Sequence, residues 1–389
     1  MLAPMRPANS IYRALGTTVF ESMSRLAAEH DAVNLGQGFP DDRGPDDVRR
    51  AAAAALVDGW NQYPSMLGLP SLRQAVAAHE QRFYGLEFDW QSEVLVTSGA
   101  TEALAAAILA LIEPGDEAVL FQPAYDAYAP LVRRAGGVPR FVTLAPPDWT
   151  LTADALAAAC GPKTKLVVLN NPLNPAGKVF SPGELNVLAR AVAAHDAYVV
   201  ADEVYEHIVF DGARHQPFIA LPGMRERTIK IGSAGKTFSL TGWKVGLVTG
   251  PRALIAPVSR AHQFLTFTTP PNLQTAVAFG LAKPDEFYLG LASELQRRRD
   301  RLGDGLRALG LTVLPAGGAY FLNVDIRSTT FAGSDVDFCR HLVENVGVAA
   351  IPLSAFYEEH AATHLVRFCF AKQDAVLDEA LRRLRVRFG

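Results

Sequence analysis

The stretch SAGKTFSLTGWKVG, residues 233–246, follows the β-branched run TIKIG at 228–232 and carries two lysines among glycines, serines and threonines. A short apolar run that ends in a Gly- and Ser-rich turn is typical of a buried strand that brings polar groups to a sheet edge. Lys236 and Lys244 lie eight positions apart. They mark a candidate site, and the rest of the chain indicates which of them does chemistry.

The TIKIG run belongs to a series of seven strand candidates. They alternate with Ala- and Leu-rich helical stretches, which predicts an α/β fold with a mainly parallel sheet covered by helices. Among the helical stretches, TEALAAAILALIEPG ends at Gly115 and PGELNVLARAVAAHD begins with Pro182 in its first turn. The strand candidates are EVLVT (93–97), EAVLF (117–121), PRFVT (139–143), KLVVL (165–169), AYVVA (197–201), TIKIG (228–232) and VGLVT (245–249).

The pattern changes after about residue 285. A long charged helix, ELQRRRDRLGDGLRAL, is followed by short apolar runs and a closing helix, DAVLDEALRRLRVRF, which predicts a smaller α+β domain. We expect an N-terminal arm with part of the small domain at residues 1–35, a large domain at 36–280 and a small C-terminal domain at 281–389.

Composition narrows the class of partner. Lys and Arg number 37 against 40 Asp and Glu, so no overall basic field exists to attract nucleic acid or a membrane surface. The N-terminus lacks an apolar leader core, and the longest apolar run, at 103–112, is too short to span a bilayer. Three widely spaced cysteines form no CxxC pair, which argues against zinc, so we expect no metal site and a reduced, cytoplasmic location.

Four polar clusters follow strands of the predicted sheet. TSGATEAL (97–104), NNPLNPAGK (170–178), DEVYEH (202–207) and SAGKTF (233–238) each begin at or beside the end of a strand. Ligands of open parallel sheets bind beyond the carboxyl ends of the strands, so the four clusters are expected to converge on one site. Each cluster alone is more often an ordinary helix entry, turn or N-cap, but four clusters on the same edge of one sheet favour a functional site.

Two cofactor chemistries use a lysine at such an edge. GKT at 235–237 resembles the end of a nucleotide-binding P-loop, but the glycine that this motif needs six positions before its lysine is here Lys230. A GxGxxG dinucleotide fingerprint is also missing from the sequence. The other chemistry is a Schiff base with pyridoxal phosphate, which needs a phosphate cradle, a carboxylate at its ring nitrogen and a lysine amine. TSGAT, Asp202 and Lys236 meet these three needs.

The motifs VTSGATEAL, NNPLNPAGK, VADEVYEH, SAGKTFSLTGWKVG and LVRFCF, in this order and across nearly the whole chain, resemble a class I/II aminotransferase of fold type I. NLGQGFPD (34–41), NQYPSMLGLPSLR (61–73) and VAAIPLSAF (348–356) resemble one branch of that family. The branch contains methionine aminotransferases, kynurenine aminotransferase/glutamine transaminase K and DapC-type succinyldiaminopimelate aminotransferases.

The resemblance implies a role for each matching residue. Lys236 matches the Schiff-base lysine, which also acts as general acid/base. Asp202 matches the partner of the ring nitrogen, Tyr205 and Asn174 the groups near the 3′-oxygen, and Tyr125 the aromatic residue stacked on the ring. Residues that match the phosphate contacts are Gly99, Ala100, Thr101, Ser233 and Lys244, the last at a position where many relatives carry arginine.

The same resemblance implies a substrate site and a homodimer. Arg367 matches the arginine that takes the substrate α-carboxylate, together with Asn174 and Gly38. Tyr63 matches a residue that reaches the cofactor phosphate of the neighbouring subunit, so two copies would share their sites. Phe20, Tyr12 and Phe267 are candidates for the side-chain pocket, whereas His207 and His262 are assigned structural roles.

The implied reaction is ping-pong transamination between an amino acid and a 2-oxo acid. No second arginine falls in a motif that would bind a distal carboxylate, which favours a neutral or aromatic donor such as methionine, glutamine, phenylalanine or kynurenine. The alternatives are succinyldiaminopimelate transamination and cysteine-S-conjugate β-lyase activity. A hypothesis outside the enzyme class is a ligand-binding module that keeps the aminotransferase fold without turnover. The presence of the full set of catalytic residues argues against this module.

Overall fold

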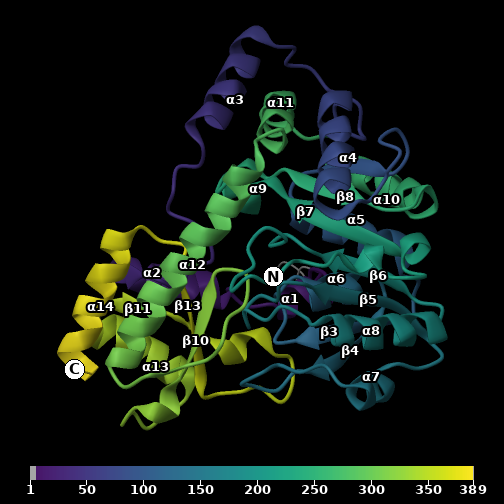
Figure 1. Cartoon of the computed structure of the whole chain (residues 1–389). Coiled ribbons are helices and arrows are strands. Elements are labelled where there is room, and N and C mark those ends of the chain that lie inside the picture. Colours follow the sequence, from purple (N-terminus) through teal and green to yellow (C-terminus); the bar gives the residue numbers. More distant parts are fainter. Residues whose placement is uncertain (1–5, 389) are drawn as a thin grey trace, which may run out of the picture.

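The computed structural model describes residues 6–388 and contains the predicted seven-stranded sheet (Figure 1). The strand order is β2-β8-β7-β6-β5-β3-β4. Strand β8 is antiparallel to both of its neighbours, and the remaining pairs are parallel. The strands are β2 (Val94–Thr97), β3 (Glu117–Gln122), β4 (Val138–Thr143), β5 (Thr164–Asn170), β6 (Tyr198–Asp202), β7 (Thr228–Ser233) and β8 (Gly246–Thr249).

Helices cover both faces of this sheet because alternate residues of its strands are apolar on both sides. Leu166 and Val168 of β5 pack with α5 (Ala100–Leu111), α6 (Tyr128–Arg134) and α10 (Arg252–Leu265). Val167 and Leu169 belong to a second core that includes α8 (Pro182–Ala194), beside α7 (Ala153–Ala159), and reaches into the C-terminal part. Helix α8 begins at Pro182, as predicted, and Ser181 closes a capping box with Glu184.

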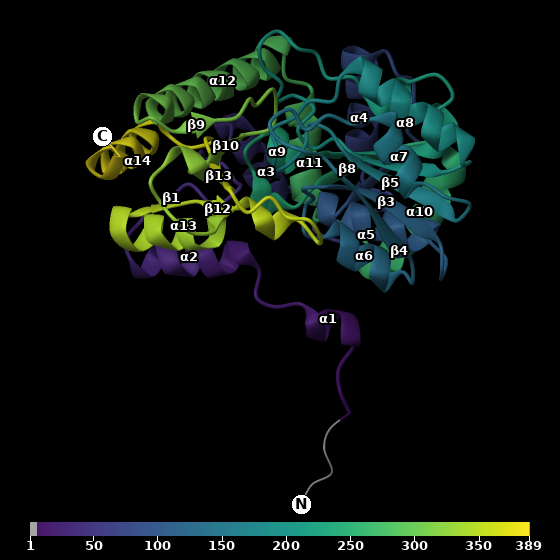
Figure 2. The ribbon, with the colours of Figure 1, turned by 90° about the horizontal axis from the view of Figure 1, so that it is seen from below.

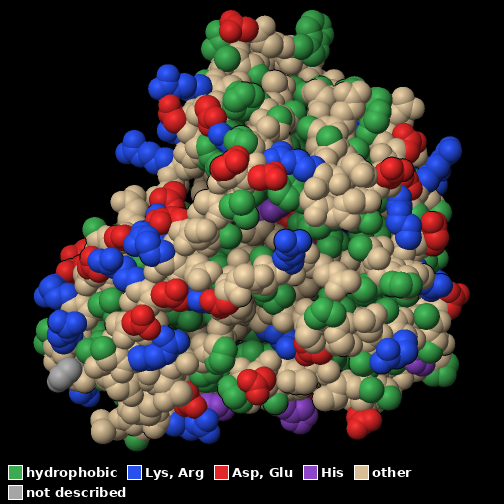
Figure 3. Space-filling model, viewed as in Figure 1, with side chains coloured by type: hydrophobic (Ala, Val, Ile, Leu, Met, Phe, Trp, Pro, Cys, Tyr) green, Lys and Arg blue, Asp and Glu red, His purple; other side chains and the backbone are tan. Residues whose placement is uncertain are grey.

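A third core lies at the antiparallel end of the sheet. There α3 (Asp46–Asp58), α4 (Pro70–Tyr84) and α11 (Pro271–Leu281) pack near β2 and β8, with α9 (Ala234–Thr237) directly after β7. Hydrophobic side chains are visible at this tip of the molecule, over α3 and α11 (Figure 3). The side chain of Trp60, just after α3, is 78% exposed. This tip is therefore a candidate for contact with another chain.

Residues from both halves of the chain, 19–35 and 285–388, build a smaller α+β part together (Figure 2). Strand β1 (Val33–Asn34) pairs in parallel with β11 (Val348–Ala349), and α2 (Val19–Glu29) follows α1 (Ser10–Ala14). A four-stranded antiparallel sheet has the order β12-β13-β10-β9. Its strands and helices are β9 (Thr312–Val313), β10 (Phe321–Asp325), β12 (Ile351–Pro352), β13 (Leu365–Cys369), α12 (Asp285–Ala308), α13 (Asp335–His341) and α14 (Asp374–Phe388).

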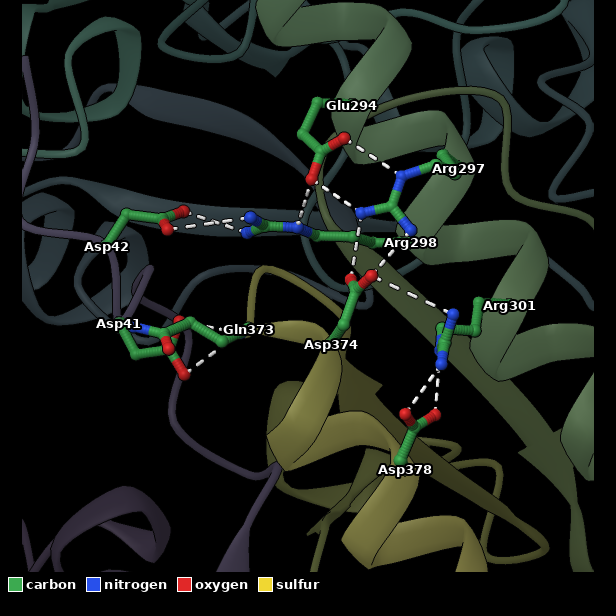
Figure 4. Close-up of polar contacts among 9 residues, drawn as sticks. All are labelled: Asp41, Asp42, Glu294, Arg297, Arg298, Arg301, Gln373, Asp374 and Asp378. Atoms are coloured by element: carbon green, nitrogen blue, oxygen red, sulfur yellow. Dashed lines mark hydrogen bonds and ion pairs between the residues drawn. The ribbon is translucent and has the colours of Figure 1, made fainter.

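The loop formed by residues 34–42 is tied to the C-terminal part by charged groups (Figure 4). Arg298 of α12 donates to Asp42 at 2.8 Å, and the backbone N–H of Gln373 donates to Asp41 at 2.9 Å. Arg297 joins α12 to Asp374 of α14 at 2.8 Å. These contacts fix the loop beside the small sheet, and the loop in turn borders the candidate site.

All seven strand predictions are confirmed to within one residue at each end. The helix in TEALAAAILALIEPG ends at Leu111, four residues before the predicted Gly115, because Pro114 disfavours helical backbone in the residue before it. The domain boundaries stay predictions. The expected absence of an apolar leader also stays a prediction, because residues 1–5 lie outside the described residues. None of the helices within 6–388 has the length and apolarity to cross a membrane.

Candidate active site

The four polar clusters lie around one cavity of about 450 Å³ at the carboxyl edge of the large sheet. The cavity extends to the small sheet, which supplies Arg367 and Phe321. Its walls contain most of the site residues predicted from the sequence: Gly38, Gly99, Ala100, Thr101, Tyr125, Asn174, Asp202, Tyr205, Ser233, Lys236, Lys244 and Arg367. The sheet topology thus brings together residues that lie more than 300 positions apart.

Lys236 lies in α9, one short turn beyond β7. Its Nζ donates to the phenol oxygen of Tyr320 at 2.9 Å. Burial lowers the pKa of the amine to about 8, although nearby Cys369 and Asp202 oppose the shift. A neutral amine is therefore accessible near neutral pH, which a nucleophile or general base requires.

Asp202 ends β6 and is 5% exposed. The Tyr128 hydroxyl donates to its Oδ2 at 2.5 Å, whereas Oδ1 is buried without a hydrogen-bond partner within the described chain. Burial raises the pKa of this carboxyl to about 6, and the Tyr128 hydrogen bond and Lys236 act in the opposite direction. An unsatisfied buried carboxylate oxygen at a cavity wall fits a ligand that brings an N–H or a positive charge.

Gly99, Ala100 and Thr101 form the first residues of α5 and its N-cap. Gly99 has a φ of +83°, and a Cβ on it would lie 3.0 Å from Cε of Lys244. Lys244 itself adopts a left-handed conformation with φ +54°. A helix N-terminus, an ammonium group and the nearby Ser233 form a cradle suited to a phosphate.

Arg367 lies in β13 and is 1% exposed. Its Nη1 donates to Asn174 Oδ1 at 3.0 Å and its Nη2 to the carbonyl oxygen of Gly36 at 2.8 Å. Nε is buried without a partner among residues 6–388, and burial lowers the pKa of the guanidinium to about 10. Arg367 is thus held in place by neutral groups, and its positive charge stays available to a carboxylate in the cavity.

Not every candidate residue lines the cavity. Phe20 does, but Tyr63, Tyr12 and Phe267 lie on the surface, where the side chain of Tyr63 is 80% exposed. The Tyr63 and Phe267 rings meet with centroids 5.3 Å apart. The expected action of Tyr63 at a neighbouring subunit's site stays a prediction.

Sequence reasoning missed several residues of the site. Tyr128 follows Tyr125 by three positions in QPAYDAY, and their rings are 5.7 Å apart, so its nearness in sequence to a candidate ring-stacking residue could have indicated it. Asn170 begins the NNPLNP cluster, and its Nδ2 donates to the backbone oxygen of Asp202 at 2.9 Å. Tyr320 and Phe321 carried no local signal, because only the packing of the small sheet brings them to the site.

The two histidines that were assigned structural roles lie outside the cavity wall. His262 contacts Glu102 at 2.9 Å, and His207 contacts His79 at 2.8 Å. His207 belongs to a buried ionic cluster on the reverse side of the 202–207 segment, where Lys230 binds Glu80 and Glu206.

This fold and this site are those of an aminotransferase. The family described as aminotransferase class I and II matches residues 30–384, and the chain belongs to that family. It is 47% identical to a probable N-succinyldiaminopimelate aminotransferase DapC of Mycobacterium tuberculosis, over 96% of this chain and 97% of that protein. It is 42% identical to a methionine aminotransferase of Escherichia coli, over 95% of this chain and 96% of that protein. A solved structure of the N-succinyldiaminopimelate aminotransferase from M. tuberculosis superposes with a TM-score of 0.95, covering 98% of this chain and 100% of the other.

Proposed function

We propose that this aminotransferase uses pyridoxal 5′-phosphate to move the α-amino group of a neutral or aromatic amino acid to a 2-oxo acid. One observation carries the proposal: an amine of lowered pKa, a carboxylate with an unsatisfied oxygen and an anchored guanidinium line one cavity. When bound, the cofactor supplies an electron sink for the bonds at the substrate α-carbon.

The described residues fit this cofactor. Oδ1 of Asp202 would accept the ring N–H, while Tyr128 keeps the carboxylate oriented through Oδ2. Gly99, Thr101 and Lys244 would hold the phosphate, and Lys236 would carry the aldehyde. Tyr205, Asn174 and Tyr125 have side chains in the same wall and would contact the ring and its 3′-oxygen.

The Lys236 amine is suited to move the proton. With a pKa near 8, Nζ is neutral in about one tenth of molecules at pH 7, far more than for an ordinary lysine, and can accept the proton of the substrate α-carbon. The same nitrogen, once protonated, could donate that proton to a second atom of the bound substrate and cofactor. Since a single base can serve both transfers, the distant His207 and His262 are not needed.

The cavity also favours a particular donor. Arg367 would hold the α-carboxylate, with Asn174 and the backbone at Gly38 beside it. In the described residues the cations of the cavity wall are Lys236, Lys244 and Arg367, so none is left for a distal carboxylate. Phe20 and Phe321 add apolar surface, which supports a methionine-, glutamine-, phenylalanine- or kynurenine-type side chain.

A second candidate is transamination of N-succinyldiaminopimelate, the substrate in the name of the M. tuberculosis relative. A neighbouring cavity of about 250 Å³ shares Thr18, Phe20, Tyr125 and Asp126 with the first and offers room for a longer side chain. Cysteine-S-conjugate β-lyase activity remains an alternative that the same cofactor would support, and a ligand-binding module without turnover is the alternative of another class.

We also infer a homodimer with shared sites in the cytoplasm. The aromatic residues Trp60, Tyr63, Phe264 and Phe267 are exposed, and Trp60 lies beside α3 and α11 at the candidate contact tip, which favours burial against a second copy. The three cysteines are all free, which supports a reducing compartment. Sedimentation analysis tests the dimer, and a monomer that binds the cofactor at full affinity would contradict it.

The decisive experiment is a visible spectrum of the chain with pyridoxal phosphate, before and after methionine is added without any oxo acid. Bleaching of the lysine-bound cofactor band indicates the first half-reaction, and the series methionine, glutamine, phenylalanine, kynurenine and N-succinyldiaminopimelate ranks the donors. Aspartate serves as the disfavoured control. A band that persists with every donor would favour the module without turnover, and fastest bleaching with aspartate would overturn the substrate proposal.

A further inference from the structure

Tyr320 is a buried residue beside the cavity that links the candidate catalytic amine to the substrate-carboxylate side of the site. Its side chain is 0% exposed, and it immediately precedes β10 of the small sheet. The phenol oxygen lies 2.9 Å from Nζ of Lys236 and 2.9 Å from the carbonyl oxygen of Gly38. One hydroxyl therefore joins α9 of the large part to the 34–42 loop.

The chemistry of the three groups fixes the direction of both hydrogen bonds. A carbonyl oxygen can only accept, so the single proton of the Tyr320 phenol is donated to Gly38. The phenol oxygen can then only accept from Lys236, which places one amine N–H on the Tyr320 side. The lone pair of the neutral amine is consequently directed away from the phenol.

We propose that Tyr320 is a positioning residue for Lys236: it holds the amine by one N–H, keeps the nitrogen lone pair available for proton transfer and couples the amine to the loop beside Arg367. The proposal rests on the catalytic role assigned above to Lys236. Because the bridge is a buried phenol with both of its hydrogen-bonding functions in use, loss of its hydroxyl removes one hydrogen bond at each end.

The surroundings of the amine isolate the contribution of Tyr320. The charged and titratable groups that act on Lys236 are Cys369, Asp202, Arg367 and Lys244, together with the phenols of Tyr205 and Tyr320. Within residues 6–388 only the Tyr320 phenol forms a hydrogen bond with Nζ. A phenol oxygen that accepts from the amine stabilises the charged ammonium form more than the neutral form.

The other end of the bridge acts on the 34–42 loop. Arg367 donates to Gly36 at 2.8 Å and Lys372 to Phe39 at 2.9 Å, so the Tyr320 bond to Gly38 lies between two further anchors. Removing the Tyr320 hydroxyl leaves those anchors intact. The loop should therefore keep its place, and the larger effect is expected at Lys236.

The test compares Tyr320→Phe with Tyr288→Phe. Tyr288 is 3% exposed and donates to the carbonyl oxygen of Leu281 at 3.1 Å, away from the cavity, so it is a matched buried phenol. Competitive acetylation of the cofactor-free full chain with acetic anhydride between pH 6 and 11, read by peptide mass spectrometry, gives the pKa of Lys236. We expect Tyr320→Phe to lower this pKa by about one unit, a shift typical of one lost hydrogen bond to a charged group, and Tyr288→Phe to leave it unchanged.

An unchanged Lys236 pKa in folded Tyr320→Phe would overturn the proposal, as would an equal decrease in Tyr288→Phe. If Tyr320→Phe does not fold, a crystal structure of the unaltered chain decides, since a separation of Nζ and the phenol oxygen beyond hydrogen-bonding distance contradicts the bridge. Borohydride reduction of the full chain with pyridoxal phosphate, followed by peptide mass spectrometry, tests the Lys236 role separately. Label at another lysine would refute that role without altering the acetylation result.

Discussion

Two lysines six positions apart, Lys230 in β7 and Lys236 in α9, meet opposite electrostatic environments. Lys230 is 1% exposed, and its Nζ binds Glu80 at 2.5 Å and Glu206 at 2.7 Å. Burial alone would lower its pKa, but the two carboxylates outweigh burial and raise it. Burial likewise lowers the pKa of Lys236, which falls to about 8 because Cys369 and Asp202 offset the burial only in part; the hydrogen-bond partner of its Nζ is a neutral phenol. The partner of the amine, more than its depth, decides whether a lysine is a fixed cation or a reactive base.

The two environments share one segment of backbone. Asp202 and Tyr205 of the 202–207 segment line the cavity, while Glu206 and His207 face the ionic cluster on the reverse side. The DEVYEH motif therefore serves the candidate chemistry with one set of side chains and binds Lys230 with another. The predictions below separate these two functions.

Replacing Lys236 should have the largest effect on activity. In Lys236→Ala the cavity loses its proton-transfer group and its aldehyde partner, and turnover of methionine with a 2-oxo acid should fall at least about 10⁴-fold. Steady-state assays measure the loss, and circular dichroism checks the fold. If the variant retains turnover, the distinction between the two lysines is wrong.

Replacing Lys230 should have the largest effect on stability. Lys230→Met leaves Glu80 and Glu206 buried without their cation, which should lower the free energy of unfolding by about 3–5 kcal/mol. Urea denaturation measures the change. The triple variant Lys230→Met with Glu80→Gln and Glu206→Gln removes the uncompensated charge and should recover most of the loss. Equal destabilisation in both variants would indicate a packing defect instead of electrostatics.

The two lysines should also give opposite dependences of stability on pH. The folded pKa of Lys236, about 8, lies below its ordinary value of 10.5, so the folded chain binds fewer protons than the unfolded chain between these values. Stability of the cofactor-free chain should therefore rise by about 2 kcal/mol from pH 8 to pH 10.5 relative to Lys236→Met. The raised pKa of Lys230 predicts a loss of stability above pH 10.5, where the unfolded chain releases that proton first. Urea titrations at several pH values measure the free energy of unfolding of the unaltered chain and of Lys236→Met. If the difference between these two free energies does not change from pH 8 to 10.5, the pKa of Lys236 is not lowered.

The smallest expected effect concerns the carboxylate at the end of β6. Tyr128→Phe removes the 2.5 Å hydrogen bond to Asp202 and should raise the pKa of that carboxyl further above 6, because the lost bond favours the charged form. The affinity for pyridoxal phosphate should fall about tenfold, which corresponds to the free energy of one such hydrogen bond. Equilibrium dialysis measures it, with Tyr288→Phe as the matched control. An unaltered affinity would assign Tyr128 to packing.

Much of this arrangement is predictable from local sequence. The β-branched runs give all seven strands, and polar clusters at the strand ends identify Asp202, Asn174 and Lys236, because parallel strands present their carboxyl ends at one edge. Contacts between distant segments are not predictable in this way. The phenol of Tyr320 is 84 positions from Lys236, and Glu80 is 150 positions from Lys230, so only tertiary packing pairs them. The role expected for the surface residue Tyr63 would need a second chain, and residues 6–388 leave that role a prediction.

The pairing of β1 with β11 has a consequence for how the protein matures during synthesis. Val33 lies beside Val348, and the 34–42 loop is anchored by Arg298, Arg367 and Gln373. The strands of the large sheet, which end at residue 249, can emerge from the ribosome and associate early. Residues 33–42, by contrast, wait for partners that are translated after the large sheet. Nascent chains truncated before β13 should therefore contain a folded sheet without a working site, and the site becomes complete only once β13 and Gln373 have been translated.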